Sequence, residues 1–311
     1  MAERLTKKQR REQTQAKIAA MRAAQARKER LRRLYTALAA VLTVIVIVGV
    51  LVIVKVAGGG GSSASSTGTG STAAPDAVVN AIGGVPAATF DTVGAGTINA
   101  APKAMQGAEA ITADGKPRVL YVGAEYCPFC AAERWAVAVA LSRFGSFSGL
   151  GVTTSAGSPE VYPNTATLSF HGATYTSSVL SFSGYEETTN KRQGSSYAPL
   201  DRLDAADQKV VDTYNKPPYT QTEGSIPFVD IAGRYVASGA IYTPKVLEGK
   251  SRAEIAAALH DPTSPVARAV DGSANVLTAA ICEATGGKPA DVCTSTGVTT
   301  AADALAQAQS R

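Results

Sequence analysis

The stretch GAEYCPFCAAERW, residues 123–135, decides the fold class of this chain. It joins RVLYVGA at 118–124, an apolar run rich in β-forming residues, to CAAERWAVAVALSRF at 130–144, which is apolar almost all round. The first run is typical of a buried strand, and the second of a helix packed against a sheet. Two of the four cysteines, Cys127 and Cys130, lie at the junction.

Three roles are open to this Cys-x-x-Cys pair: metal binding, a local structural disulfide, and exchange of electrons with another protein. A zinc site made of cysteines needs a second pair roughly 15–20 residues further on. The remaining cysteines are Cys282 and Cys293, which are far away, and the histidines His171 and His260 show no ligand spacing. We therefore expect no metal. A disulfide within the pair would close too short a loop to restrain the unfolded chain much.

The redox role suits the chemistry of the junction. A helix N-terminus offers free N–H groups and about half a positive charge, which favours a thiolate at Cys127. Pro128 suits the first helical turn, where its missing N–H costs nothing. Cys130, one turn into the helix, is expected to be less exposed and to act as the resolving thiol. The sequence therefore favours a catalytic Cys127/Cys130 pair.

The other two cysteines predict a structural disulfide. Cys282 and Cys293 bracket EATGGKPADV, in which the glycines and the proline permit a turn. In an oxidising compartment they are expected to join and tie the last helix to the tail. A loop of this size is worth up to roughly 2.5 kcal/mol in the chain-entropy model. A relay of electrons to or from the first pair is the alternative.

The charge of the chain is unevenly distributed. Its formal net charge is +5, but residues 1–33 hold 12 Lys/Arg and 3 Glu, so the remainder is acidic. Nucleic-acid binding is disfavoured, because it needs basic residues on the folded domain. Leu34–Val54 follows with 21 uncharged residues, which as a helix span roughly 32 Å and suit a hydrocarbon core of about 30 Å. The segment is too long for the apolar core of a signal peptide and lacks its cleavage site.

These features predict a single-pass membrane protein in contact with the lipid bilayer. The basic segment 1–33 places the N-terminus in the cytoplasm and the main domain outside the cell membrane. Residues 55–75 read as a flexible Gly/Ser/Thr linker. A folded domain is expected over 76–295, and a disordered tail over 296–311.

Within the domain, apolar periodicity and turn residues predict further elements. Helices are expected near 76–84, 201–215, 251–260 and 275–287, and strands near 165–170, 178–185 and 225–240, the last with a turn at Gly233. This order suits an α/β fold with a central sheet flanked by helices.

The strand, the Cys-Pro-Phe-Cys motif and the long helix together resemble the thioredoxin fold. In that superfamily a cis-proline loop lies opposite the cysteines and binds the backbone of the substrate. Ser225-Ile226-Pro227-Phe228 matches that loop. The resemblance therefore implies a cis Ile226–Pro227 bond, a catalytic role for Pro227 and a substrate contact for Ile226.

Three segments of the sequence resemble a narrower family of membrane-anchored thioredoxin-like proteins, which is catalogued as a domain of unknown function. The segments are YVGAEYCPFC, GSIPFVDIAGRY and AAICEATGGKPADVC. The similarity covers about 76–295. The chain departs from thioredoxins in having Tyr126, not Trp, before the first cysteine, and from DsbA-type oxidants in having Phe129 instead of His. The 97 residues from Cys130 to Pro227 imply a long insertion at about 145–215.

Three residues beside the cysteines are further candidates. Glu125 ends the strand and could accept a proton from a thiol, although a solvated carboxylate is the alternative. Tyr126 and Phe129 could form an apolar rim that binds an unfolded client, although packing against their neighbours is equally plausible.

The expected function is an extracytoplasmic thiol–disulfide oxidoreductase acting on the thiols or disulfides of exported proteins, with oxidant or isomerase favoured over reductant. No cofactor is expected. Because Leu34–Val54 contains no cysteine, a quinone-linked or thiol-relay membrane partner would have to restore the Cys127/Cys130 pair. The alternative is a non-catalytic thioredoxin-like binding or assembly module of the cell envelope.

Overall fold

Strand β4, Lys116–Gly123, is the centre of the main sheet. In the computed structural model, which describes residues 71–309, β4 pairs in parallel with β9 (Ser181–Glu186) and antiparallel with β12 (Phe228–Ile231). A turn joins β12 to β13 (Tyr235–Ser238). It contains Gly233, as predicted, at a φ of 69°. The short strands β2 (Lys103–Ala104) and β3 (Thr112–Ala113) extend the sheet at its edges. The fold is mixed α/β.

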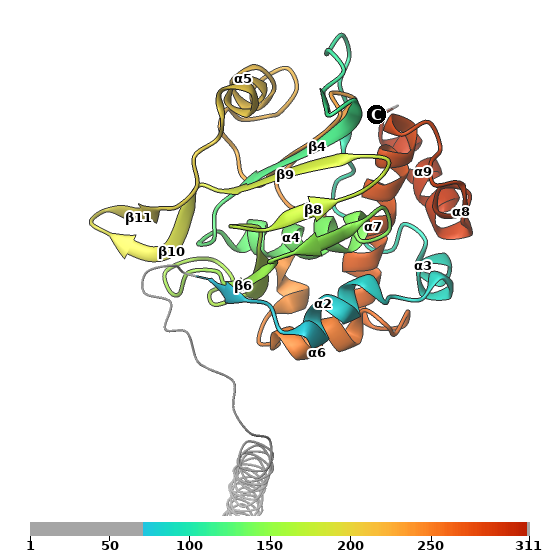
Figure 1. Ribbon diagram of the computed structural model, residues 1–311. Coiled ribbons are helices and arrows are strands. Elements are labelled where there is room, and N and C mark those ends of the chain that lie inside the picture. Colours follow the sequence, from blue (N-terminus) through green and yellow to red (C-terminus); the bar gives the residue numbers. More distant parts are fainter. Residues whose placement is uncertain (1–70, 310–311) are drawn as a thin grey trace, which may run out of the picture. The chain divides into compact units, whose positions relative to one another are not determined.

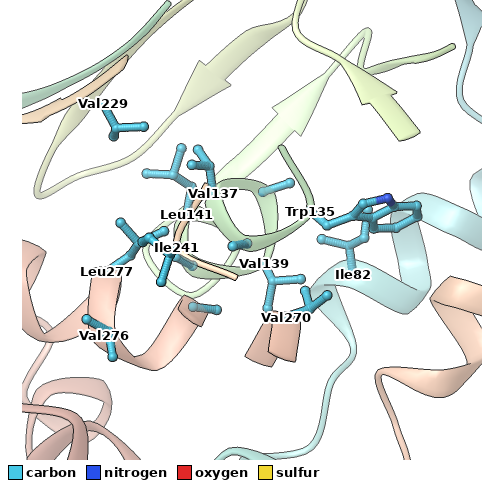
Figure 2. Close-up of a cluster of buried hydrophobic side chains, with 14 of the residues drawn as sticks. Ile82, Trp135, Val137, Val139, Leu141, Val229, Ile241, Val270, Val276 and Leu277 are labelled. Carbon is cyan, nitrogen blue, oxygen red and sulfur yellow. The ribbon is translucent and has the colours of Figure 1, made fainter. Parts of the chain in front are cut away.

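Helices α4 (Pro128–Leu141) and α7 (Pro265–Ala284) cover one face of this sheet. In α4 every residue except Phe129 is buried, as the all-round apolar pattern of the sequence predicts. Figure 2 shows its apolar side chains between the sheet and α7. Trp135 lies in this core, as an apolar side chain of its size would be expected to, and its indole N–H donates to the carbonyl oxygen of Ala166 at 3.1 Å.

Helix α5, Ala205–Tyr214, covers the opposite face of the sheet (Figure 1). Successive side chains of a strand alternate between faces, so Leu120 and Val122 of β4 point into the smaller core beneath α5. A buried ion pair between Arg118 of β4 and Asp207 of α5 ties the helix to the sheet. Helices therefore lie on both faces, as the order of elements predicts.

The segment 145–215, expected to be an insertion, is only partly one, because it supplies β9 to the main sheet. Its remaining strands make smaller sheets at the periphery: β5 (Ser146–Ser148) with β8 (Thr174–Thr176), β6 (Gly151–Thr154) with β7 (Ala166–Ser169), and the hairpin β10 (Thr188–Gln193) with β11 (Ser196–Pro199). The hairpin projects from the body of the domain (Figure 1).

The remaining helices surround α4 and α7. They are α2 (Asp76–Gly83), α3 (Ala87–Val93), the 3-10 helix η1 (Pro244–Leu247), α6 (Arg252–Ala258), α8 (Ala290–Cys293) and α9 (Thr296–Gln309).

The expectation of a disordered tail over 296–311 is wrong for the part that the structure describes. Residues 296–309 form α9, which buries Val298, Ala301 and Leu305. These residues recur at helical spacing and pack against α3 and α7. The Ala-rich composition hides a narrow apolar stripe among small residues.

The end of the expected linker is also ordered. β1, Thr72–Ala73, pairs with β6, and therefore the folded domain begins a few residues before Asp76. The basic segment 1–33, the expected span Leu34–Val54 and the linker as far as residue 70 lie outside the described residues. Between residues 71 and 309, the structure contains no helix with the length and apolar character needed to cross a membrane.

Candidate functional site

The N-terminus of α4 holds the cysteine pair. Cys127 is the N-cap residue, and its Sγ accepts a hydrogen bond from the Cys130 N–H at 3.3 Å. Its own N–H donates to the Ala124 carbonyl oxygen at 3.2 Å, and Pro128 opens the helix. Both thiols are free, and Cys127 retains 7% exposure while Cys130 has none. The outer and inner positions predicted for the two thiols are therefore confirmed.

The two thiols differ in acidity. A hydrogen bond from the Cys130 side chain, helped by backbone N–H groups and by the charge of Arg134, lowers the pKa of Cys127 to about 7 against the opposing effect of burial. Complete burial raises the pKa of Cys130 well above its ordinary value. The thiolate is the reactive form of a cysteine, and Cys127 is the thiol of the pair that ionises more readily.

A buried ion pair lies beneath the cysteines. Nε and Nη2 of Arg134 donate to the two carboxylate oxygens of Glu186, both at 2.7 Å, and neither side chain is exposed. Nη2 also donates to the Ala124 carbonyl oxygen at 2.6 Å, the same atom that accepts from Cys127. The positive charge is therefore fixed to the loop that carries Cys127.

Our sequence reasoning missed the role of this pair. The available signal was Arg134 itself, because a charged residue in a fully buried helix needs a partner, and it lies one turn after Cys130. Glu186 gave no signal, since it is 52 residues away and only the parallel pairing of β9 with β4 brings it near.

Glu125, the predicted proton acceptor, is fully buried. Its Oε1 accepts from the Ser169 hydroxyl at 2.8 Å, and its Oε2 has no hydrogen-bond partner in the part of the chain that the structure describes. The alternative of a solvated carboxylate is therefore wrong. Glu125 is therefore a buried carboxyl group two residues before Cys127, with one oxygen that has no hydrogen-bond partner among the described residues.

The two aromatic candidates have different environments. Tyr126 stacks on Tyr197 of β11, with ring centroids 4.2 Å apart and planes inclined by 7°. Phe129 is 41% exposed and makes an edge contact with Tyr162 at 6.3 Å. Val161, next to Tyr162, is also exposed. Phe129 therefore belongs to an exposed apolar rim, whereas Tyr126 fixes the hairpin to the cysteine loop.

The Ile226–Pro227 peptide bond is cis, as the resemblance implied. The register of β12 pairs Phe228 with Val122, so the two preceding residues run alongside the end of β4. Ile226 and Tyr126 line one cavity of about 320 Å³. The structure therefore brings together two of the three residues expected to contact a substrate, whereas Phe129 does not line this cavity.

Cys282 and Cys293 form the predicted disulfide. It lies near the C-terminal end of α4, since Arg143 just beyond that helix donates to the Ser295 hydroxyl at 3.3 Å. A helix of 14 residues is about 21 Å long. The two cysteine pairs are therefore separated by roughly the length of α4, which argues against direct exchange between them.

The histidines take part in separate hydrogen bonds. His171 Nδ1 lies 2.6 Å from an Asp201 carboxylate oxygen, and His260 Nε2 lies 3.0 Å from the Ala81 carbonyl oxygen. Over residues 71–309, no three His, Cys, Asp or Glu side chains are grouped to hold a metal ion.

Comparison with known proteins gives one match. A family model described as "Domain of unknown function (DUF929)" matches residues 103–283, more than half of the chain. The matched part runs from β2 to Glu283 in the last turn of α7 and includes the cysteine pair, the Arg134–Glu186 ion pair and Pro227. No curated protein and no solved structure matches the chain.

Proposed function

The chain belongs to the family described as "Domain of unknown function (DUF929)". We propose that it is a thiol–disulfide oxidoreductase with a thioredoxin-like domain. The protein would be anchored in the cell membrane, with this domain on the outer side, where it acts on exported proteins. One observation carries this proposal: at the N-terminus of α4, Cys127 is acidified and Cys130 is not. A structural thiol pair has no need of such a difference.

Two features of the fold support a thioredoxin-like domain. The sheet order β9–β4–β12–β13, with one parallel pair followed by two antiparallel ones, places the cysteine helix after the central strand. The Pro227 loop enters β12 beside the end of β4 from which the cysteine loop leaves. Such a fold would let a client polypeptide meet both loops at once.

In the oxidising direction, the pair starts as a Cys127–Cys130 disulfide. A client thiolate attacks Cys127 Sγ, the bond between the two cysteines breaks, and Cys130 leaves and takes up a proton. A second client thiolate then attacks the client sulfur of the mixed disulfide and releases the Cys127 thiolate. The client has lost two electrons and the pair has gained them. In the reverse direction, Cys127 attacks a client disulfide and Cys130 resolves it.

Glu125 would donate a proton to Cys130 when the protein oxidises a client, and accept one from it when the protein reduces a client. Its Oε2 is buried and has no hydrogen-bond partner among the described residues. Burial raises the pKa of the Cys130 thiol, so a base that accepts its proton would speed its attack on the mixed disulfide; Glu125 is the candidate because it is a buried acid two residues before Cys127.

The acidity of Cys127 bears on the direction of electron transfer between the protein and its clients. A stabilised thiolate is a good leaving group and favours the reduced pair, which makes a stronger oxidant. Phe129 stands where DsbA-type oxidants have a histidine, and Arg134 supplies a positive charge from beneath instead. We expect a reduction potential between about −270 mV, as in thioredoxin, and about −120 mV, as in DsbA. This range favours the oxidant or isomerase role.

The membrane location rests on the sequence of residues 1–54. The +9 block 1–33 and the uncharged Leu34–Val54 support a single span with the N-terminus inside. An oxidant at that location needs a quinone-linked membrane partner, and a reductant needs a transmembrane thiol relay.

A second candidate function is a non-catalytic binding module. The exposed Phe129 and Val161 beside the pair favour it, because an apolar rim can hold an unfolded chain without exchanging thiols.

The deciding experiment uses the full-length protein in detergent to reduce insulin and to refold scrambled ribonuclease. We expect activity in at least one assay, abolished by Cys127→Ser. The Cys130→Ser variant should accumulate mixed disulfides with exported proteins through Cys127. Absence of activity in both assays, together with no trapped client, would overturn the enzyme assignment and leave the binding module.

A further inference from the structure

A cavity of about 320 Å³ opens beside the cysteine pair. Three segments line it: the cysteine loop, the residue before Pro227, and the chain from the end of β9 through the β10–β11 hairpin. The lining residues are Ala124, Tyr126, Glu187, Thr188, Ser195, Ser196, Tyr197 and Ile226. The cavity therefore touches both loops that the proposed chemistry requires.

The aromatic wall of this cavity is held in place by several contacts. Tyr126 precedes the nucleophile and stacks on Tyr197 of the hairpin. The Tyr197 hydroxyl donates to Glu160 at 2.8 Å, and the Arg192 guanidinium lies 4.7 Å from the centre of the Tyr197 ring. Because these contacts fix the hairpin against the cysteine loop, the cavity does not depend on a ligand to form.

The charge in the cavity is negative. Glu187 is the only charged residue of the lining, and no described Lys, Arg or His forms a salt bridge with it. Partial burial raises the pKa of its carboxyl. Arg192 of the hairpin is directed to Tyr197 and to Glu160, at 4.0 Å from the latter.

The other polar groups of the cavity can also accept hydrogen bonds. Thr188 Oγ1 has no hydrogen-bond partner within residues 71–309, and Ser195 and Ser196 bring hydroxyls from the hairpin turn. A carboxylate, hydroxyl oxygens and an aromatic wall together suit a long cationic side chain, whose alkyl part packs on rings while its head is bound by oxygens.

We propose that this cavity binds a Lys or Arg side chain of a client polypeptide close to the client's reacting cysteine, with Glu187 as the residue that determines this preference. The inference rests on the proposed function for the identity of the client. Tyr126 is adjacent to Cys127, and an extended chain advances about 3.3–3.6 Å per residue. The basic residue is therefore within about two positions of the client cysteine.

The experiment compares peptides that each carry one cysteine as a mixed disulfide with glutathione. They differ only in having Lys, norleucine or Glu at positions −2 to +2 from that cysteine. The rate constant for reaction with the reduced full-length protein in detergent is measured by quenched mass spectrometry. At the best position, the Lys peptide should react about threefold to fivefold faster than the norleucine peptide, as expected for a half-exposed ion pair. The Glu peptide should be slowest.

Two variants test whether Glu187 causes the preference for Lys. Glu187→Gln should abolish the difference in rate between the Lys and norleucine peptides. Glu248→Gln, which alters an exposed glutamate after η1 outside this cavity, should keep the preference. An equal loss in both variants, or a preference that survives in Glu187→Gln, would overturn the inference.

A binding measurement separates this inference from the proposed function. The Cys127→Ser/Cys130→Ser double variant has no exchange chemistry, and fluorescence anisotropy reports its affinity for labelled peptides with Ser in place of Cys. A preference for Lys that depends on Glu187 supports the cavity even if no variant exchanges thiols. Equal affinity for the Lys and Glu peptides, or no binding of either, overturns it.

Discussion

Arg134 and Cys127 donate to one acceptor, the carbonyl oxygen of Ala124. The guanidinium is completely buried, and Glu186 holds it through both carboxylate oxygens. A positive charge in such a place cannot be screened by solvent, so its effect on the adjacent thiolate is larger than that of a surface residue.

Replacing Arg134 should therefore change the chemistry of the pair. Arg134→Met should raise the pKa of Cys127 from about 7 by about one unit, and Arg134→Lys, which keeps the charge, should raise it less. Absorbance of the thiolate near 240 nm against pH gives the value. Arg118→Met and Arg118→Lys are matched controls, because Arg118 also forms a buried ion pair but at the far end of β4. An equal change in the Arg118 variants would contradict the assignment.

Glu125→Gln should slow the resolving step. A buried base contributes roughly a hundredfold to proton transfer, so the mixed disulfide on Cys127 should persist while its formation stays close to normal. Stopped-flow mixing with quenched mass spectrometry separates the two steps. Glu133→Gln, which changes an equally buried glutamate of α4, is the control. Unchanged resolution in Glu125→Gln would exclude a proton-transfer role.

The buried acids of the core predict a pH dependence of stability. Burial raises the pKa of Glu133 to about 7 and that of Asp271 to about 8, from ordinary values of 4.5 and 3.8. Between the ordinary and the raised pKa of each group, the folded state binds more protons than the unfolded state. The stability that these groups contribute is therefore fully present below about pH 4 and is lost as pH rises through 7 to 8. The slope is up to about 1.4 kcal/mol per pH unit for each group.

Urea unfolding between pH 5 and 8 tests this. Glu133→Gln and Asp271→Asn should each flatten the decline, whereas the exposed Glu248→Gln should not. Stability that rises with pH over this interval would contradict the prediction.

Replacing both Cys282 and Cys293 by Ser should lower stability by about 1–3 kcal/mol without removing thiol exchange. The reason is distance, because the disulfide lies near the other end of α4 from Cys127. Denaturant unfolding and the insulin assay measure the two effects. Loss of exchange in a normally folded variant would instead indicate a relay.

The location of the domain can be tested directly. A reporter fused after Arg311 should be active outside the cytoplasm, and protease added to intact cells should digest the chain beyond the linker. Full protection from protease would contradict the orientation inferred from residues 1–54.

The parts of the fold that the sequence predicts are those set by local pattern. The strand ending at Gly123, the helix with Pro128 in its first turn and the disulfide of Cys282 depend on neighbours along the chain. β9 could not be assigned to the main sheet in this way, because its parallel pairing with β4 joins residues far apart in sequence. The same pairing brings Glu186 to Arg134, which is why sequence reasoning missed the ion pair.

Helix α9 was missed for a different reason. Val298, Ala301 and Leu305 are too few and too small to stand out as an apolar face, and they matter only because α3 and α7 lie against them. α7 begins earlier than the helix expected at 275–287, although Ser264 and Pro265 are ordinary signals for a helix start.

The two consecutive glutamates at the end of β9 have different proposed roles: one holds the charge beside the thiol, and the other binds the client. Glu186, the last residue of β9, bonds to the guanidinium of Arg134, and Glu187, which follows the strand, lines the cavity. The β10–β11 hairpin that follows leaves and rejoins the domain at paired residues, Thr188 and Pro199. Other hairpins grafted between these two residues, with Tyr197 kept so that its stacking on Tyr126 remains, would change the lining of the cavity without altering the Arg134–Glu186 ion pair, and would thereby test whether the choice of client can be redirected.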